Sequence, residues 1–380
     1  VYTQGQSQDW YTELAALQIS GLRANDDDAK LPRATPLFYG EHLFDFGDRG
    51  LLGINASTAY LTRDVGVDSK RASVGADWSV SRVLPGGVLL QPFAEARYDN
   101  YTFNDAPSGK SGLERAAANV GARLSYPLYR PGKSFDLIVE PLAMVAYGTP
   151  GANNPDIPLE DSSFFEFDES NLLEANAQGG YDLYEGGTKA SLGLSATARW
   201  KNGVSMTALG GRRWRDRNDT AFSKGSNLDG TVSDWVAGVS ADLGRSLSFE
   251  TRARFDSDDL GLNRIDAGVK TAIGRFSGRA RYFKLNEDLT SLNVPEEGIE
   301  VHTRFRLTEN YYASYGQTTD IVQSRDLRQY MGISYEDDCS VFQILVTRSE
   351  AIDRTLGPND SITFVFSLKS LGSFGSSEFD

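Results

Sequence analysis

The stretch S-L-S-F-E-T-R-A-R-F-D at Ser246–Asp256 alternates apolar and polar residues along its whole length. One face of this segment holds Leu247, Phe249, Thr251, Ala253 and Phe255, and the other holds Ser248, Glu250, Arg252, Arg254 and Asp256. Because successive side chains of a strand point to opposite sides, this period of two predicts a β-strand with one apolar face and one charged face.

The same alternation recurs along the chain, most clearly at Arg71–Val80, Arg115–Tyr126, Lys189–Trp200 and Ile299–Leu307. It predicts about 18 strands in all. Many strands with one apolar and one charged face are typical of an antiparallel transmembrane β-barrel that stands in lipid and encloses water. A large soluble β-sandwich produces the same alternation, so the pattern alone leaves that alternative open.

The composition narrows the class of protein further. The chain has 380 residues, a formal net charge of -14 and a mean hydropathy of -0.38. No apolar run approaches the roughly 18 residues that a transmembrane helix requires. The acidic balance argues against a nucleic-acid partner. Cys339 is the only cysteine, so it is either a buried thiol or half of a bridge to a segment outside this chain.

The predicted connections between strands alternate between short and long. Tight turns such as Gly244–Ser246 and Gly274–Arg275 contrast with long polar loops. The long loops are Arg23–Thr35, Asn104–Gly112, Thr149–Gly187, Asp216–Thr231, Asn286–Gly298 and Ala351–Asp360. Outer-membrane barrels have short periplasmic turns and longer surface loops, so this alternation favours a barrel over a sandwich. The last strand is predicted at Ser361–Leu371, with the C-terminus in the periplasm.

The longest loop carries a recognisable series of motifs. V-E-P-L at Val139–Leu142 precedes S-F-F-E-F-D-E-S-N-L-L at Ser163–Leu173 and G-G-Y-D at Gly179–Asp182. This order resembles the barrel domain of the LptD (OstA) family of lipopolysaccharide-assembly proteins. Similar motifs are L-T-R-D at Leu61–Asp64, R-A-S-V-G-A-D-W at Arg71–Trp78, G-I-S-Y-E-D-D-C at Gly332–Cys339 and F-V-F-S-L-K-S-L-G at Phe364–Gly372. The resemblance extends from about Leu31 to Gly372.

The resemblance implies a barrel of about 26 strands in the Gram-negative outer membrane. It implies an LptE-like lipoprotein plug in the lumen and an LptA-like periplasmic bridge that delivers lipopolysaccharide through a separate N-terminal domain. Residues 1–380 would then be the C-terminal portion of the barrel, without that periplasmic domain and the first strands. Lipopolysaccharide would leave sideways through a seam beside the last strand, at Ile362, Thr363, Phe364, Val365 and Phe366.

Two groups of charged residues are candidates for this function. The predicted luminal face carries Glu95, Arg97, Asp99, Glu250, Arg252, Arg254, Glu300, Arg304 and Arg306. These residues form either a solvated wall of paired charges or a surface for the plug and for sugar and phosphate groups, which the arginine fork suits. The loop acids either keep the loops soluble or share divalent cations with lipopolysaccharide. They are Asp26, Asp27, Asp28, Glu160, Asp161, Glu166, Asp168 and Glu169.

Cys339 gains a second interpretation from the family, which carries a cysteine bridged to the N-terminal domain at this turn. Ser340 stands where a second family cysteine would lie. A general diffusion porin and a soluble β-rich adhesion module remain alternatives. An enzyme is not predicted, because His42 and His302 are the only histidines and no triad, metal cluster or phosphate loop accompanies them. No catalytic residue, metal or cofactor is therefore assigned.

Overall fold

The computed structural model describes residues 1–21, 27–104, 108–162, 166–286, 296–350, 358–369 and 372–374. Its regular structure is almost entirely antiparallel β-strand, with three short 3-10 helices at Asp28–Lys30, Gly47–Arg49 and Lys224–Ser226 among these residues. None of the helices in this part of the chain has the length and apolar character needed to cross a membrane. Outside the described residues lie the parts of the predicted loops at 22–26, 105–107, 287–295 and 351–357, residues 163–165 of the longest loop, and residues 370–371 of the predicted last strand.

The number of strands agrees with the sequence prediction. The described residues form 22 strand segments, and setting aside the four of two to five residues (β1, β6, β9 and β22) leaves 18 strands of eight residues or more. Alternation over eight residues is visible in sequence, whereas segments of two or three residues contain too few side chains to show a period.

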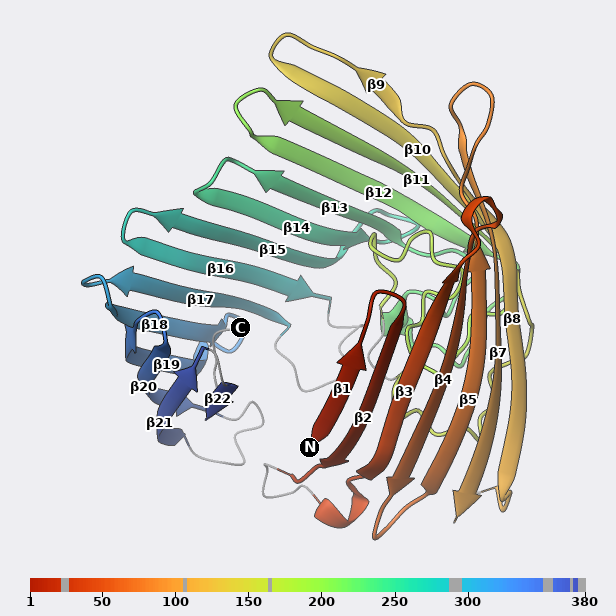
Figure 1. Ribbon diagram of the computed structural model, residues 1–380, viewed down its shortest axis with the longest axis horizontal. Helices are drawn as coiled ribbons and strands as arrows, with labels where there is room; N and C mark the ends of the chain where they lie inside the picture. The colour runs from red at the N-terminus through yellow and green to blue at the C-terminus, as the bar shows by residue number, and fades with distance from the viewer. Residues whose placement is uncertain are drawn as a thin grey trace. The chain divides into compact units, whose positions relative to one another are not determined.

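Contacts between Cα atoms divide the chain into two compact units. Unit 1 comprises residues 1–128, 139–195 and 210–234, and unit 2 comprises residues 129–138, 196–209 and 235–380. The strands as far as the longest loop are β1 (Tyr2–Gln6), β2 (Trp10–Gln18), β3 (Arg33–Asp45), β4 (Leu51–Thr62), β5 (Asp68–Ser79), β6 (Arg82–Val83), β7 (Leu89–Asn104), β8 (Gly112–Ser125), β9 (Leu128–Arg130) and β10 (Phe135–Gly148). In unit 1 the strands from β1 to β8 pair antiparallel in chain order (Figure 1). The short β6 is the exception to a simple series, because β5 and β6 both pair with the same edge of β7.

After the longest loop come β11 (Gly187–Trp200) and β12 (Ser205–Arg215), which contribute residues to both units. Unit 2 continues with β13 (Trp235–Asp242), β14 (Leu247–Phe255), β15 (Leu262–Ile273), β16 (Phe276–Leu285), β17 (Glu297–Arg306), β18 (Tyr311–Asp320), β19 (Arg325–Glu336), β20 (Ser340–Ser349), β21 (Asn359–Leu368) and β22 (Gly372–Phe374). Each strand from β13 to β22 pairs antiparallel with the next. Tight turns at Gly244 (φ 90°) and Gly274 (φ 61°) use a backbone conformation that favours glycine.

Strand burial follows the period of two. On β20, Phe342, Ile344 and Val346 are 41%, 37% and 54% exposed, whereas Leu345 between them is fully buried. A run of exposed large apolar side chains on one face is expected where lipid, rather than water, covers the strand. The opposite face carries the polar residues, and in unit 1 the longest loop covers part of it.

Several predicted boundaries are wrong. The loop predicted at Arg23–Thr35 ends earlier, because β3 begins at Arg33, and the one predicted at Asp216–Thr231 extends to residue 234. The strand predicted at Ser361–Leu371 is β21, Asn359–Leu368, and it is not the last, because β22 pairs back onto Phe366–Leu368. β21 ends at Leu368 and β22 begins at Gly372, whereas the prediction continued one strand to Leu371.

Candidate functional site

The charged residues predicted to face the lumen all lie on the polar faces of their strands. Glu95, Arg97 and Asp99 lie on β7, Glu250, Arg252 and Arg254 on β14, and Glu300, Arg304 and Arg306 on β17. The first group belongs to unit 1 and the other two belong to unit 2. The two units hold these residues in different ways.

In unit 2 the charges form cross-strand pairs. Arg281 hydrogen-bonds to Asp266 on one side and lies 3.8 Å from Glu300 on the other. The Arg304 Nη2 and Glu336 Oε2 atoms are 2.8 Å apart, and Lys369 Nζ reaches the same carboxylate at 3.1 Å. Because these side chains are partly exposed, each pair contributes at most about 1 kcal/mol. This arrangement matches the interpretation as a solvated wall of paired charges.

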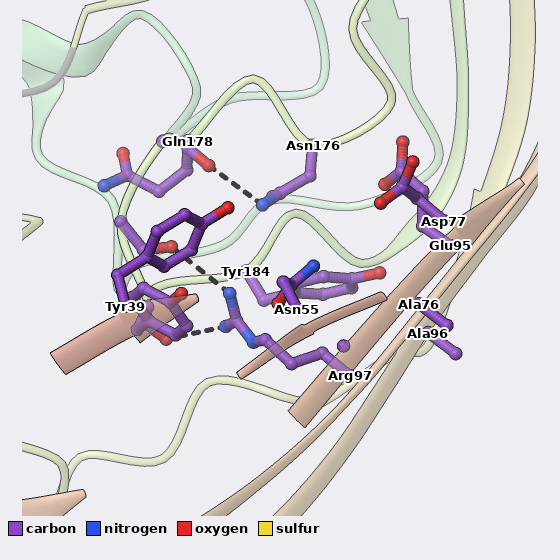
Figure 2. A pocket seen from close by; sticks show the side chains of 14 residues that line it. Tyr39, Asn55, Ala76, Asp77, Glu95, Ala96, Arg97, Asn176, Gln178 and Tyr184 are labelled. Atoms are coloured by element: carbon purple, nitrogen blue, oxygen red, sulfur yellow. Dashed lines mark hydrogen bonds between the residues drawn. The ribbon is translucent and has the colours of Figure 1, made fainter. Parts of the chain in front are cut away.

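In unit 1 the polar face binds the longest loop, residues 149–186. Arginines on neighbouring strands donate to backbone carbonyl oxygens of the loop: Arg97 to Tyr181 at 2.7 Å, Arg115 to Asp182 at 2.8 Å and Arg123 to Leu173 at 2.8 Å. Figure 2 shows the guanidinium of Arg97 with dashed lines to two carbonyl oxygens of the loop, which are those of Gly180 and Tyr181. Carbonyl groups of an irregular segment must find donors when they are buried, and the strand arginines supply them here.

Apolar contacts also hold the longest loop against the strands of unit 1. Phe93, Met144 and Ala146 of the strands form a buried cluster with Ala175 of the loop, and Tyr101 and Phe103 form another with Ile157. Phe167 of the F-D-E-S-N-L motif is fully buried as well. The core of unit 1 thus lies between the strands and a folded loop, although the sequence analysis treated this loop only as a polar surface connection.

A buried ion cluster lies at the base of the loop. Arg213 Nη1 and Glu185 Oε2 are 2.7 Å apart, and both side chains are fully buried. Arg215 Nε lies 3.4 Å from the other carboxylate oxygen, and Lys189 Nζ donates to the backbone oxygen of Glu185. Arg213 also donates to the carbonyls of Leu172 and Glu174. Three buried cations therefore surround Glu185, whose carboxylate pairs with two of them, at the point where the loop returns to β11.

Asp99 plays a similar role on β7. Its fully buried carboxylate accepts hydrogen bonds from Arg115 Nε at 2.8 Å and Nη2 at 2.7 Å, and from Arg97 Nε at 3.2 Å. Because the carboxylate fixes both guanidinium groups, their remaining N–H groups point to the loop carbonyls. The predicted luminal residues Arg97 and Asp99 therefore position the loop.

Two acids join the start and the end of the loop. Asp182 Oδ2 accepts the backbone N–H groups of Glu160 and Asp161 at 2.7 and 2.9 Å. Asp161 Oδ1 in turn accepts those of Tyr181 and Asp182 at 3.0 and 3.1 Å. Arg71 Nη1 lies 2.7 Å from Asp161 and 3.4 Å from Asp182. These reciprocal hydrogen bonds hold residues 160–161 against residues 181–182.

Two of the loop acids have strand arginines as partners. Asp161 is paired with Arg71, and Glu160 is paired with Arg63 at 2.6 Å, with both partners of the second pair largely buried. Their charges are neutralised by strand arginines, so neither solubility nor shared divalent cations is needed to explain them. No group of three or more His, Cys, Asp or Glu side chains that could hold a metal ion occurs among the described residues.

We expect the loop to be held more firmly at pH 5 than at pH 7.5. Burial, followed by repulsion from Asp161, raises the pKa of Asp182 to about 6, well above its unfolded value of about 3.9. Folded Asp182 therefore keeps its proton between about pH 4 and 6, so stability decreases as the pH rises through this window. Burial is the largest single influence on Asp161 and would raise its pKa. The charge and hydrogen bond of Arg71, together with hydrogen bonds from Asp182 and Ser162, outweigh burial and lower that pKa, so its contribution is lost only in stronger acid.

Hydrogen-exchange protection of the Glu160 and Asp161 amides measures this effect, after correction for the intrinsic pH dependence of exchange. Because only the part of the titration above pH 5 falls between these two pH values, the difference should correspond to about 1.4 kcal/mol. In Asp182→Asn, the difference between the two pH values should disappear. Protection that is equal at both pH values in the unmodified protein, or greater at pH 7.5, would contradict the expectation.

The residues predicted at the seam lie on β21. Ile362, Phe364 and Phe366 are 63%, 61% and 43% exposed, and Thr363 and Val365 belong to the opposite face. β20 pairs along one edge of β21 from Asn359 to Leu368. On the other edge, the described residues provide only β22, which pairs with Phe366–Leu368.

Cys339 lies in the turn between β19 and β20. Its thiol is free and exposed, and its backbone N–H donates to Asp337 Oδ1 at 2.9 Å. This N–H and that of Ser340 lower the pKa of Asp337. An exposed thiol in a fixed turn is accessible to a partner, and the predicted disulfide with a segment outside this chain stays a prediction.

Most of the residues that hold the longest loop against the strands were not predicted from the sequence. These are Arg63, Arg71, Arg115, Asp182, Glu185, Lys189, Arg213 and Arg215. A signal was present in R-R-W-R at Arg212–Arg215, where two arginines share the strand face opposite Trp214. Two cations on the same inward face require an anion, and Glu185 is the last acid of the longest loop before β11 begins.

Comparisons with known proteins extend these observations. A family model described as "LptD: LPS transport system D" matches residues 1–311. A curated LPS-assembly protein LptD from Burkholderia thailandensis is 26% identical over 247 residues, which cover 62% of this chain and 30% of that protein. Its namesake from Burkholderia pseudomallei is 25% identical over 230 residues, which cover 57% and 28%. The chain thus spans less than a third of the length of these relatives.

Solved structures give a weaker likeness. The FrpB iron transporter from Neisseria meningitidis (F5-1 variant) has a TM-score of 0.48 and 12% identity, with 98% of this chain and 73% of that chain covered. The ferric enterobactin receptor PfeA from Pseudomonas aeruginosa has a TM-score of 0.47 and 10% identity, with 97% and 69% covered. Both scores are below 0.5, and nothing about function follows from them.

The family match covers most of the chain in a single span. It confirms the resemblance found in the sequence, and with the antiparallel strands it confirms the predicted β-barrel fold class and the location in the Gram-negative outer membrane. The chain belongs to the LptD family of LPS transport proteins.

Proposed function

We propose that this chain is part of a translocon that inserts lipopolysaccharide into the outer leaflet of the outer membrane. The observation that carries the proposal is the LptD family match over residues 1–311. The curated relatives are named LPS-assembly proteins. Because the chain spans less than a third of their length, the substrate and the partners of the whole protein are proposed for it.

Strands with one apolar face and one polar face suit an amphiphilic substrate. Lipopolysaccharide joins acyl chains, which dissolve in lipid, to sugars and phosphates, which need water or polar partners. The polar faces of units 1 and 2 provide such partners, and the exposed apolar faces, such as Phe342, Ile344 and Val346 on β20, suit lipid. Transport then needs no covalent chemistry, only a path along which both parts of the molecule remain solvated.

The path out of the barrel is proposed to lie beside β21. In the described part of the chain, β22 covers only three residues of its outer edge, so Asn359–Val365 has no strand on that side. An open edge in lipid is costly because its N–H and C=O groups lack partners. A strand from outside this chain is therefore expected to close it, through few enough hydrogen bonds to open again.

Three partners follow from the proposal. An LptE-like lipoprotein plug would lie against the polar faces, which carry Glu250, Arg252, Arg254 and Arg306 on unit 2. An LptA-like periplasmic bridge would deliver lipopolysaccharide through the N-terminal domain of the whole protein. Outer-membrane lipid would surround the apolar faces.

Locking the seam should stop lipopolysaccharide from reaching the cell surface. In the full-length protein, Val365→Cys would be linked covalently to a cysteine on the first strand of the barrel. The matched control links the same Val365→Cys to Gln343→Cys, its direct neighbour on β20, which should leave delivery normal. Normal surface lipopolysaccharide in cells that contain only the seam-locked protein would rule out lateral exit at β21.

Cys339 should be oxidised in the full-length protein from the cell envelope. Its exposure in the turn before β20 leaves the thiol accessible, and the periplasm is oxidising. Thiol labelling of denatured protein before and after reduction measures the bridge, with labelling expected only after reduction. Complete labelling without reduction would show that Cys339 forms no bridge.

A further inference from the structure

Two long connections of unit 1 fold together into one layer, which we call the cap. It comprises residues 149–162, 166–186 and 216–234. The backbone N–H of Phe167 donates to Ser226 O at 2.8 Å, and Asn227 Nδ2 donates to Phe167 O at 3.2 Å. Asn153 Nδ2 donates to Asp219 Oδ2 at 2.8 Å. Each connection thus supplies hydrogen-bond partners for the other.

The cap has a buried apolar interior. Phe167, Leu172, Phe222 and Leu228 are each at most 3% exposed. The guanidinium carbon of Arg213, a strand residue, lies 4.5 Å from the ring centroid of Phe167, so the interior is continuous with the polar face below it. Segments that open and close during function are drawn from the least stable parts of a protein, which have few buried apolar contacts. The cap does not have this character.

Arginines of several strands attach the cap to the polar face of unit 1. They are Arg63 beside β4, Arg71 on β5, Arg97 on β7, Arg115 and Arg123 on β8, and Arg213 and Arg215 on β12. Their partners in the cap are carboxylate groups and backbone carbonyl oxygens. Because the attachments lie on different strands, the cap can leave the polar face only if many of them break together, and each buried group would lose its partner.

Two glycines let the cap rest directly on the strands. A Cβ atom at Gly193 on β11 would lie 2.8 Å from Leu172 Cδ2, and one at Gly211 on β12 would lie 2.5 Å from the same atom. A side chain at either position would displace Leu172, which is 1% exposed. The cap therefore meets β11 and β12 without a layer of water between them.

We propose that the cap is a fixed part of the barrel wall and that it stays bound to its strands while lipopolysaccharide passes. Long loops often act as lids, but release of this cap would separate Arg213 from the carbonyl groups of Leu172 and Glu174 and would expose Phe167 to water. Opening for the substrate is then left to the seam beside β21. The inference rests on the proposed function and goes beyond it, because it assigns the cap a role during transport.

The test is a disulfide that locks the cap to its strands in the full-length protein. Leu172→Cys with Gly193→Cys places two thiols where the cap meets β11. Ala152→Cys with Ala117→Cys does the same on β8, where both alanines belong to one buried cluster. The disulfides form in the oxidising periplasm, and thiol labelling of the denatured protein measures them. Leu172→Cys alone and Ala152→Cys alone are the matched controls, because they change the cap without locking it.

Cells that contain only a cap-locked protein should deliver lipopolysaccharide to their surface as well as cells with the controls. Loss of delivery in either locked protein, present in the outer membrane at the same amount as its control, would overturn the proposal. Thiols that remain free in both pairs would overturn it too. The second pair decides if the first disturbs folding. The seam lock at Val365 is a separate readout: delivery despite that lock contradicts lateral exit, whereas loss of delivery through a cap lock contradicts only the fixed cap.

Discussion

Glu185→Gln should destabilise the protein by about 3–5 kcal/mol, because it leaves buried cations without their counter-charge. Glu185 contacts Arg213 and Arg215 through its carboxylate and Lys189 through its backbone oxygen. Burial makes each uncompensated cation costly, and glutamine keeps the shape of the side chain while removing its charge. The measurement is the free energy of unfolding of the full-length protein in lipid bilayers, together with protease cleavage within residues 149–186.

Glu174→Gln is the matched control. Glu174 also pairs with a strand arginine, Arg123, at 2.8 Å, but its side chain is 54% exposed. Because water screens this pair, its loss should change stability by less than about 1 kcal/mol. Equal effects of the two substitutions would contradict the assignment of the Glu185 cluster as the charge that holds the loop base.

The second large effect concerns the faces of the strands. Phe249→Arg on β14 and Leu194→Arg on β11 should each destabilise the barrel by roughly 2–4 kcal/mol, if these positions lie near the bilayer midplane. Both residues belong to the exposed apolar face, at 38% and 52% exposure. Arginine in that position carries a charge into hydrocarbon.

The neighbouring serines provide the controls, since a shift of one residue reverses the face. Ser248→Arg and Ser195→Arg place the same charge on the polar face and should be nearly neutral. Reversible unfolding in bilayers compares the four variants. Equal destabilisation at serine and at apolar positions would contradict the orientation of the strands toward lipid.

The alternation of side chains made most of the strands predictable, because it depends only on residues next to each other in sequence. The segment Ser246–Asp256 shows it directly, since β14 occupies Leu247–Phe255 with the predicted faces. The long connection was also delimited correctly, as β10 ends at Gly148 and β11 begins at Gly187. The glycine, proline, asparagine and aspartate residues that favour turns mark the ends of strands in the sequence itself.

The packing of the loop against the strands could not be predicted in the same way. Arg63 pairs with Glu160, 97 residues away, and Arg115 donates to the carbonyl of Asp182, 67 residues away. Such partners depend on how the loop folds in three dimensions, and no period in the sequence encodes them. The polar composition of residues 149–186 suggested solvent, whereas the buried arginines supply the donors that make a polar loop compatible with burial.

The arrival of new lipopolysaccharide at the cell surface tests the central claim most directly. Cells would be depleted of the full-length protein, and surface lipopolysaccharide and the influx of small hydrophilic solutes would be measured during depletion. The account predicts that newly made lipopolysaccharide stops reaching the surface, that solute influx does not decrease, and that the unmodified protein restores delivery. Unchanged surface lipopolysaccharide with a loss of solute influx would contradict it and identify a general diffusion porin instead.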